Sequence, residues 1–316
     1  MRFPGGTDES PWAGRTAAVL GLAHRTERCS AAEMLEVAGA WSRIAGDPLA
    51  DPSLAPTWVV SRAARQEWTV ALSGDGGDEL LSGYPRLRFM PRMRRTLAVP
   101  SSLRRRAAPF LPARRWAAKL GAALAADDEW SAYQALQGVW PAHEAARLCG
   151  APESALPWSQ DLLDRLVDLP VWHRYRVLDA VTFLPDRVLA TVDRASMDNS
   201  LEVRVPLLDH RVVELLLSLP PRLGSDKSVL RRVVRRLGVP QPPRTKRGFE
   251  VPLAEWMRGP LRDRMHADLF GRTADGLGLD RHTLERIWGE HQAGRADHGE
   301  RLLTVAVLVG WVEQWL

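Results

Sequence analysis

The sequence predicts an α/β fold in which a small parallel sheet is joined to a large, mostly helical C-terminal part. An apolar run beginning at Thr69 indicates a short buried strand, and a glycine-rich turn follows it directly. Helical spacing of apolar residues then resumes over residues 79–90. Residues 55–66 also have helical spacing, and a helix that leads into a buried strand favours a parallel sheet.

The composition is that of a soluble globular protein. The chain has 316 residues, 45% of them hydrophobic and 26% charged, with a net charge of +5. This mild positive excess suits anionic substrates, and nucleic-acid binding is not favoured. Cys29 and Cys149 give neither a disulfide framework nor a zinc-ligand spacing, which predicts a reducing, cytoplasmic location. The N-terminus lacks the apolar core of a signal peptide, and the apolar run at residues 302–312 predicts a buried terminal helix, so no membrane association is expected.

The first fifty residues predict two helices and no strand. The first covers residues 12–22, and Ser30 resembles the N-cap of the second, over residues 31–44. A parallel nucleotide-binding sheet usually places its phosphate loop after its first strand, yet no strand with a glycine-rich loop precedes Asp8. A turn cluster at residues 47–53 then leads to the helix before the strand.

The glycine-rich turn, residues 73–79, carries the candidate chemistry. At the carboxyl end of a parallel strand, the backbone amides of such a turn can approach a phosphate closely. Free phosphate beside Asp75, Asp78 and Glu79 would be repelled, whereas Mg2+ bound to one or two carboxylates and to phosphate oxygens would bridge them. In a second interpretation, Asp78 is only the N-cap of the next helix and Glu79 favours its dipole. The residues alone leave both open.

A shift in composition near Arg86 predicts the division of the chain into two parts. We expect an α/β nucleotide-binding core over residues 1–98 and a helical part over residues 99–316, packed as one domain. Arginines crowd residues 86–115. They would form either the solvated face of connecting helices or a docking patch for an acidic partner.

Charged residues recur among apolar ones between residues 184 and 209. Because buried charges are expected to pair, the segment could be a buried ion network that fixes a loop. Alternatively, Asp193, Arg194, Glu202 and Arg204 could shape a pocket for a small zwitterion, whose ammonium and carboxylate need both signs of charge.

Lys246 lies in a cationic loop, residues 243–249. A lysine on a flexible stem can follow a moving phosphoryl group and is therefore a candidate phosphate ligand. The other interpretation is a solvated loop.

Taken in this order, these segments resemble the synthetase domain of the glutamine-dependent asparagine synthetase family. The matching residues are Asp8-Glu9, His24, 47–53, 73–79 with Gly83-Tyr84, 193–197, 201–209 and 246–249. The similarity runs from about Phe3 to the C-terminus and is weakest across residues 90–180. It implies an incomplete parallel sheet of the adenine-nucleotide α-hydrolase-like (PP-loop ATPase) type.

The resemblance also implies an activity: ATP-dependent activation of a carboxylate, aspartate being expected, as an acyl-adenylate that ammonia converts to an amide. Asp78 would ligate Mg2+, Asp75 would act in forming the adenylate, and Lys246 would stabilise the α-phosphoryl transition state. The expected ATP contacts are Ser73, Gly74, Gly76 and Gly77. The expected substrate contacts are Asp193, Glu202 and Arg204.

Two features of the family are not found in this sequence. Its members carry a Ser-Gly-Gly-x-Asp-Ser phosphate loop upstream of the position of Asp8, and an N-terminal glutaminase whose nucleophile is a cysteine, whereas Arg2 follows Met1 here. We therefore expect a chain truncated at its start or completed by a separate polypeptide that supplies the phosphate loop and glutaminase. The alternatives are an inactive scaffold or binding module, an amide ligase for a substrate other than aspartate, and, more weakly, RNA binding by residues 86–115.

Overall fold

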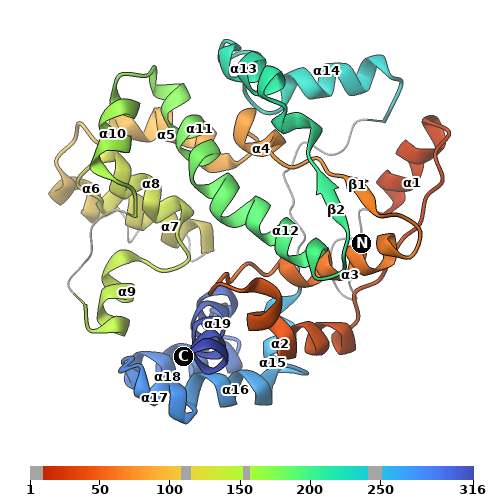
Figure 1. Cartoon of the computed structure of the whole chain (residues 1–316). Helices are drawn as coiled ribbons and strands as arrows, with labels where there is room; N and C mark the ends of the chain where they lie inside the picture. The colour runs from red at the N-terminus through yellow and green to blue at the C-terminus, as the bar shows by residue number, and fades with distance from the viewer. Residues whose placement is uncertain (1–9, 108–114, 152–156, 241–250) are drawn as a thin grey trace.

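The computed structural model describes residues 10–107, 115–151, 157–240 and 251–316 (Figure 1). Most of these residues are helical, and two short strands form a parallel pair. The predicted α/β class, a small parallel sheet with a large helical part, is confirmed, and the PP-loop assignment stays a prediction. In chain order the elements are α1 (Ser10–Val19), α2 (Ala31–Ala45), α3 (Leu54–Arg65), β1 (Val70–Leu72), α4 (Gly77–Leu80), α5 (Pro85–Thr96), α6 (Ser101–Ala107), α7 (Arg115–Ala125), α8 (Glu129–Gln137), α9 (Ala142–Cys149), α10 (Gln160–Val167), α11 (Val171–Val181), the π-helix η2 (Leu184–Leu189), α12 (Ala190–Met197), β2 (Glu202–Arg204), the 3-10 turn η3 (Pro206–Leu208), α13 (His210–Ser218), α14 (Ser228–Arg236), α15 (Leu253–Arg258), α16 (Arg262–Phe270), α17 (Arg272–Gly276), α18 (Arg281–Gln292) and α19 (Gly299–Trp315).

The sheet is built from two segments that lie far apart in the sequence. β1 and β2 run parallel, with Val70 opposite Glu202 and Leu72 opposite Arg204 (Figure 1). The prediction of a buried first strand is wrong, because Val70 is exposed and the Leu72 side chain is 73% exposed. Strands of parallel sheets become buried when helices and further strands cover them. Within the described ranges no third strand joins this pair.

The chain after β1 forms two helices where one was predicted over residues 79–90. α4 ends at Leu80, and α5 begins at Pro85. Between them Ser82 adopts a left-handed conformation (φ 50°) and Tyr84 is extended. Proline disfavours helical geometry in the residue before it and suits the first position of a helix, so Pro85 ends one helix and starts the next.

Local signals place α2 and α19 as the sequence predicts. The Ser30 hydroxyl accepts the Glu33 N–H at 3.2 Å and the Glu33 carboxylate accepts the Ser30 N–H at 2.8 Å, which is a capping box. α19 is a buried terminal helix, with Leu302 and Val309 fully enclosed. No helix in the described parts of the chain is both long enough and apolar enough to cross a membrane.

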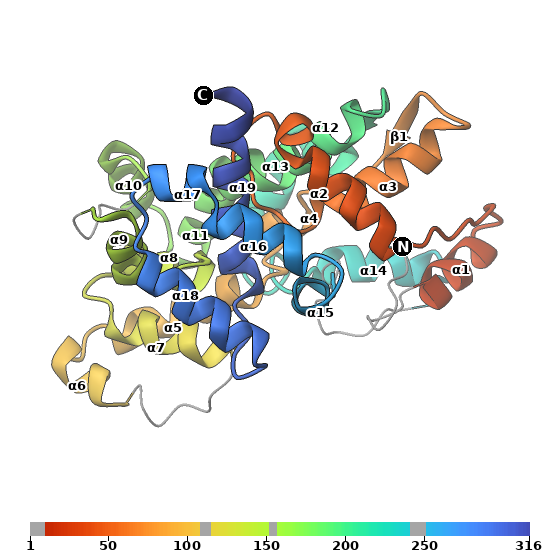
Figure 2. The same cartoon turned by 90° about the horizontal axis from the view of Figure 1, so that it is seen from below.

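The described core consists of two large hydrophobic clusters and a smaller third one around Leu80, Leu81 and Leu216. The first joins α2 and α3 to α15–α19, so segments from opposite ends of the chain pack together, and α19 lies beside α2 and α16 (Figure 2). The second joins α5 to α7, α8, α10 and α11. It includes Met90 and Tyr133, which lie on either side of the predicted boundary between residues 98 and 99. That boundary stays a prediction.

Candidate active site

The glycine-rich turn lies at the carboxyl ends of both strands. The Ser73 N–H donates to the Arg204 carbonyl at 2.9 Å, which extends the β1–β2 ladder by one bond. The Ser73 hydroxyl donates to the Asp75 carboxylate at 2.7 Å. Gly76 has a left-handed backbone (φ 81°), and a Cβ at this residue would overlap the Leu208 side chain of η3. Glycine is therefore required where the turn packs against the segment that follows β2.

Asp78 does not cap a helix. The N-cap of α4 is Gly76, and Asp78 lies within the first turn with its carboxylate 2.7 Å from the Lys227 ammonium. The Asp78 side chain is 13% exposed and that of Lys227 is 32% exposed. A Cβ on Gly83 would overlap the Asp78 carboxylate and come within 2.7 Å of Lys227 Cε, so glycine at this position makes room for the ion pair. The N-cap interpretation is wrong, and the metal-ligand interpretation stays a prediction.

Lys227 is presented by a strained backbone. Asp226 (φ 54°) and Lys227 (φ 53°) are consecutive left-handed residues, a conformation that costs about 1–2 kcal/mol for each non-glycine residue. The Lys227 N–H donates to the Leu81 carbonyl at 3.1 Å, and Arg88 pairs with Asp226 at 2.8 Å. The sequence indicates only that a basic helix starts here. It gives no signal for Lys227 as a site residue, because the signal is the backbone conformation.

Glu79 faces the interior. Its side chain is buried, and the Tyr84 hydroxyl donates to it at 2.7 Å. Burial raises the pKa of the Glu79 carboxyl, an effect that the Tyr84 hydrogen bond opposes. Arg86 stacks on the Tyr84 ring and pairs with the buried Asp179 at 2.6 Å, so Glu79 belongs to a polar cluster between α4, α5 and α11. It anchors α4, whereas Asp78 faces the loop that carries Lys227.

The second predicted group of charges is exposed rather than buried. Glu202 and Arg204 pair with each other at 2.7 Å on the open face of β2, and Asp193 is exposed on α12. Asp193 makes no ion pair within the described part of the chain. The expectation of a buried ion network is therefore wrong for these residues, because the two-stranded sheet leaves β2 uncovered. The pocket interpretation stays a prediction, and Lys246 lies outside the described residues.

The half-buried ion pair of this region involves a different arginine. Arg187 of η2 donates to Asp51 at 2.6 Å and so ties η2 to the turn before α3. Burial opposes ionisation of Asp51, but the charge and hydrogen bond of Arg187, with two hydrogen bonds from Ser53, leave the pKa of this carboxyl below its usual value. The sequence places Asp51 in a turn cluster that matches the family, but it does not predict the pairing with Arg187.

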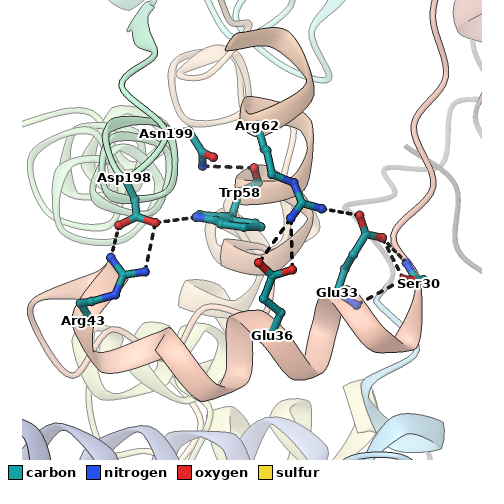
Figure 3. Close-up of polar contacts among 8 residues, drawn as sticks. All are labelled: Ser30, Glu33, Glu36, Arg43, Trp58, Arg62, Asp198 and Asn199. Atoms are coloured by element: carbon teal, nitrogen blue, oxygen red, sulfur yellow. Dashed lines mark hydrogen bonds and ion pairs between the residues drawn. The ribbon is translucent and has the colours of Figure 1, made fainter. Parts of the chain in front are cut away.

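A polar network fixes the point at which the chain enters β2. Asp198, just after α12, accepts a hydrogen bond from the Trp58 indole at 2.7 Å and pairs with Arg43 of α2 (Figure 3). The Asn199 amide donates to the Trp58 carbonyl at 3.3 Å. Trp58 lies on α3, the helix that leads into β1. One network therefore holds the segments that enter both strands.

The chemistry of the turn suits a single-carboxylate metal site. Among the described residues, no group of three or more His, Cys, Asp or Glu side chains is placed to hold a metal ion. Mg2+ in nucleotide sites commonly takes one or two carboxylates and fills its shell with phosphate oxygens and water. Asp78, a largely enclosed carboxylate in the first turn of the helix that follows the glycine-rich turn, fits this requirement.

Comparison with known proteins decides the family. A family model for asparagine synthase matches residues 1–316. The chain belongs to the asparagine synthase family. A protein of Mycobacterium tuberculosis (strain ATCC 25618 / H37Rv), named "Putative asparagine synthetase (glutamine-hydrolyzing)", is 29% identical over 315 residues, which is 94% of this chain and 47% of that protein. Asparagine synthetase (glutamine-hydrolyzing) 1 of Bacillus subtilis (strain 168) is 25% identical over 97% of this chain and 50% of its own.

Membership of the asparagine synthase family confirms the resemblance found in the sequence. The chain spans about half the length of the curated relatives it matches. In the described part of the domain, Asp78 of the glycine-rich turn lies next to Gly83 and Lys227.

Proposed function

We propose that this chain carries the nucleotide-activating machinery of an ATP-dependent, amide-forming ligase. Its substrate would be a carboxylate, aspartate being the first candidate, and the amine would be ammonia. The observation that carries the proposal is the Asp78 carboxylate, which is largely enclosed in the first turn of α4, where the glycine-rich turn after β1 leads into that helix. Membership of the asparagine synthase family supports the same reaction class.

Asp78 would hold Mg2+, which when bound neutralises charge on the pyrophosphate that leaves. Lys227 orients the carboxylate by pairing with it at 2.7 Å. Ser73, Gly74, Gly76 and Gly77 would contact ATP through the turn. Asp75, oriented by the Ser73 hydroxyl at 2.7 Å, would act in adenylate formation, and Lys246 would stabilise the α-phosphoryl group.

In the first step a carboxylate oxygen of the substrate attacks the α-phosphorus of ATP, and the bond from that phosphorus to the bridging oxygen breaks, releasing pyrophosphate. In the second step ammonia attacks the acyl carbon, the bond to AMP breaks, and nitrogen loses a proton to give the amide. Asp193, Glu202 and Arg204 are the proposed contacts to the substrate. Both charge signs are available there, because Glu202 and Arg204 adjoin on β2.

We also propose that a polypeptide segment outside the described residues adds to the sheet in PP-loop fashion and brings the phosphate loop. The exposure of β1 supports this, because parallel strands in α/β proteins are normally covered on both faces. A glutaminase, on the same or another polypeptide, would supply ammonia. The reaction would take place in the cytoplasm.

Pyrophosphate release from Mg-ATP tests the proposal. We expect aspartate-dependent release by the chain together with the segment that brings the phosphate loop, and a loss of about 100-fold or more in Asp78→Asn. Asp263→Asn, an exposed position on α16, is the matched control and should leave the rate unchanged. No release with aspartate or with other carboxylates would contradict the proposal, whereas release only with another carboxylate would reassign the substrate.

A nucleotide-free binding module is the second candidate function. The closed Asp78–Lys227 pair favours it, because the ammonium already neutralises the carboxylate expected to hold Mg2+. Calorimetry on the chain together with the segment that brings the phosphate loop separates the two: Mg-ATP binding that Asp78→Ala abolishes supports the ligase, and no binding with the wild-type chain supports the module.

A further inference from the structure

Arg176, in the middle of α11, is a buried cation that the proposed function does not use. Its side chain is fully enclosed, and its guanidinium lies 4.7 Å from the centre of the Trp172 ring. Within the described residues it pairs with no carboxylate, and burial lowers its pKa to about 10. An enclosed charge without a counter-charge is costly, so the contacts that it does make are informative.

The first contact is with α4, the helix that carries Asp78. Arg176 Nη2 donates to the carbonyl of Leu80, the last residue of that helix, and to the Leu216 carbonyl of α13 at 2.7 Å. Cations stabilise the carbonyl end of a helix, and a four-residue helix is too short to persist without tertiary contacts. The guanidinium therefore fixes α4 two residues beyond Asp78.

The second contact is with the loop that carries Lys227. A Cβ at Gly224 would lie 3.0 Å from Arg176 Nη1 and 3.1 Å from the Trp172 ring, so the backbone of this loop passes close to the guanidinium and leaves no room for a side chain. Three residues later the chain reaches Lys227, whose N–H donates to the Leu81 carbonyl. One side chain thus donates to the first of the two segments that present the Asp78–Lys227 pair and lies close to the second.

We propose that Arg176 is a positioning residue that sets the separation between Asp78 and Lys227. It contacts neither side chain, and acts through the carbonyl of Leu80 on one side and the backbone of Gly224 on the other. If the proposed function holds, on which this inference rests, Arg176 also sets how readily Asp78 takes Mg2+. Without the guanidinium, the end of α4 and the loop of Lys227 would keep only the bond from the Lys227 N–H to the Leu81 carbonyl and the apolar packing of Val229 and Leu230 against Leu80 and Leu81.

Arg174 offers a matched control on the same helix. It too is buried and donates to backbone carbonyls, those of Leu169 (2.9 Å) and Val167, but its charge pairs with Glu129 at 2.8 Å. All these partners lie in or beside α8 and α10, away from α4. Replacing Arg174 should therefore destabilise the fold without changing the Asp78–Lys227 pair.

Carbodiimide coupling measures that pair without any activity. The reagent takes up the water released when the Asp78 carboxylate and the Lys227 amine form an amide, and mass spectrometry of the digested protein gives the yield. We expect Arg176→Met to lower this yield about 10-fold, Arg176→Lys to lower it less, and Arg174→Lys to leave it unchanged. Lys227→Arg, which removes the amine, sets the background. If Arg176→Met does not fold, the comparison of coupling yields between Arg176→Lys and Arg174→Lys tests the inference instead.

The Mg2+ concentration at half-maximal pyrophosphate release is the second readout, and it should differ from that of the wild-type protein in the Arg176 variants alone. Equal coupling yields in folded Arg176 and Arg174 variants would overturn the inference. Failure of the wild-type protein to release pyrophosphate would instead count against the proposed function, because the coupling result is obtained independently.

Discussion

Asp78 and Glu79 are neighbours in the sequence whose carboxylates meet different surroundings. Asp78 is paired with Lys227, whereas Glu79 is buried and accepts hydrogen bonds from neutral donors, the Tyr84 hydroxyl and its own backbone N–H. Its ionisation therefore costs free energy in the folded protein. The pattern of the turn predicts that acidic side chains gather there. It does not predict which one is buried, because that depends on α11 packing against α4.

The pH dependence of stability should reveal this difference. Burial raises the pKa of Glu79 in the folded protein above its usual 4.5. As the pH rises past 4.5, Glu79 therefore ionises first in the unfolded chain. The free energy of unfolding falls until the pH passes the pKa of Glu79 in the folded protein. Glu79→Gln cannot ionise and can still accept from Tyr84. We expect it to gain stability relative to the wild-type protein between pH 4 and pH 7, as measured by urea unfolding. Glu214→Gln, at an exposed site, is the control. If the difference in unfolding free energy between Glu79→Gln and the wild type were the same at pH 4 and at pH 7, ionisation of Glu79 would carry no cost.

At the scale of elements, the sequence predicts best where the signal is local. The capping box at Ser30 and the apolar run of α19 place their helices correctly. The single helix expected over residues 79–90 fails at Ser82, because a left-handed residue within a turn has no apolar periodicity to mark it. The exposure of β1 is also not readable, since it depends on which segments cover the sheet.

Substitutions at Asp198 measure how much its network with α2 and α3 contributes to stability. Asp198→Ala removes the acceptor of Trp58 and the partner of Arg43 together, and should cost about 1–3 kcal/mol of unfolding free energy. Asp198→Asn keeps an acceptor for the indole and should cost less, because Arg43 is mostly exposed. Urea unfolding measures both, with Asp164→Ala on α10 as the exposed control. Equal losses in Asp198→Ala and Asp164→Ala would contradict a role for the network.

At the scale of the whole molecule, the two large hydrophobic clusters determine how the helices pack, and the order of segments along the chain does not predict this packing. The family and its α/β class follow from motifs read in order, but the packing of α2 and α3 against α15–α19 does not, because no local pattern records contacts between the two ends of a chain. The same limit applies to Arg176, whose partners lie 40 and 96 residues away.

Hydrogen exchange should show whether each cluster opens as a unit. Leu302→Ala creates a cavity in the first cluster and should cost about 2–5 kcal/mol, lowering amide protection in α2 and α3 as well as in α19. Leu178→Ala in the second cluster should instead lower protection in α8 and α11. Each variant is the control for the other. If either one lowers protection throughout the described helices equally, the clusters unfold as a single unit.

The uncovered first strand also bears on how the protein behaves at high concentration. β1 presents an apolar side chain, Leu72, next to backbone groups that no third described strand pairs, and such an edge is a template on which another copy can add. Beside it, the adjacent opposite charges of Glu202 and Arg204 cancel, so they give two approaching copies little repulsion. Colloidal stability and completion of the sheet would therefore be linked, because a segment that occupied this edge would also protect the protein from self-association.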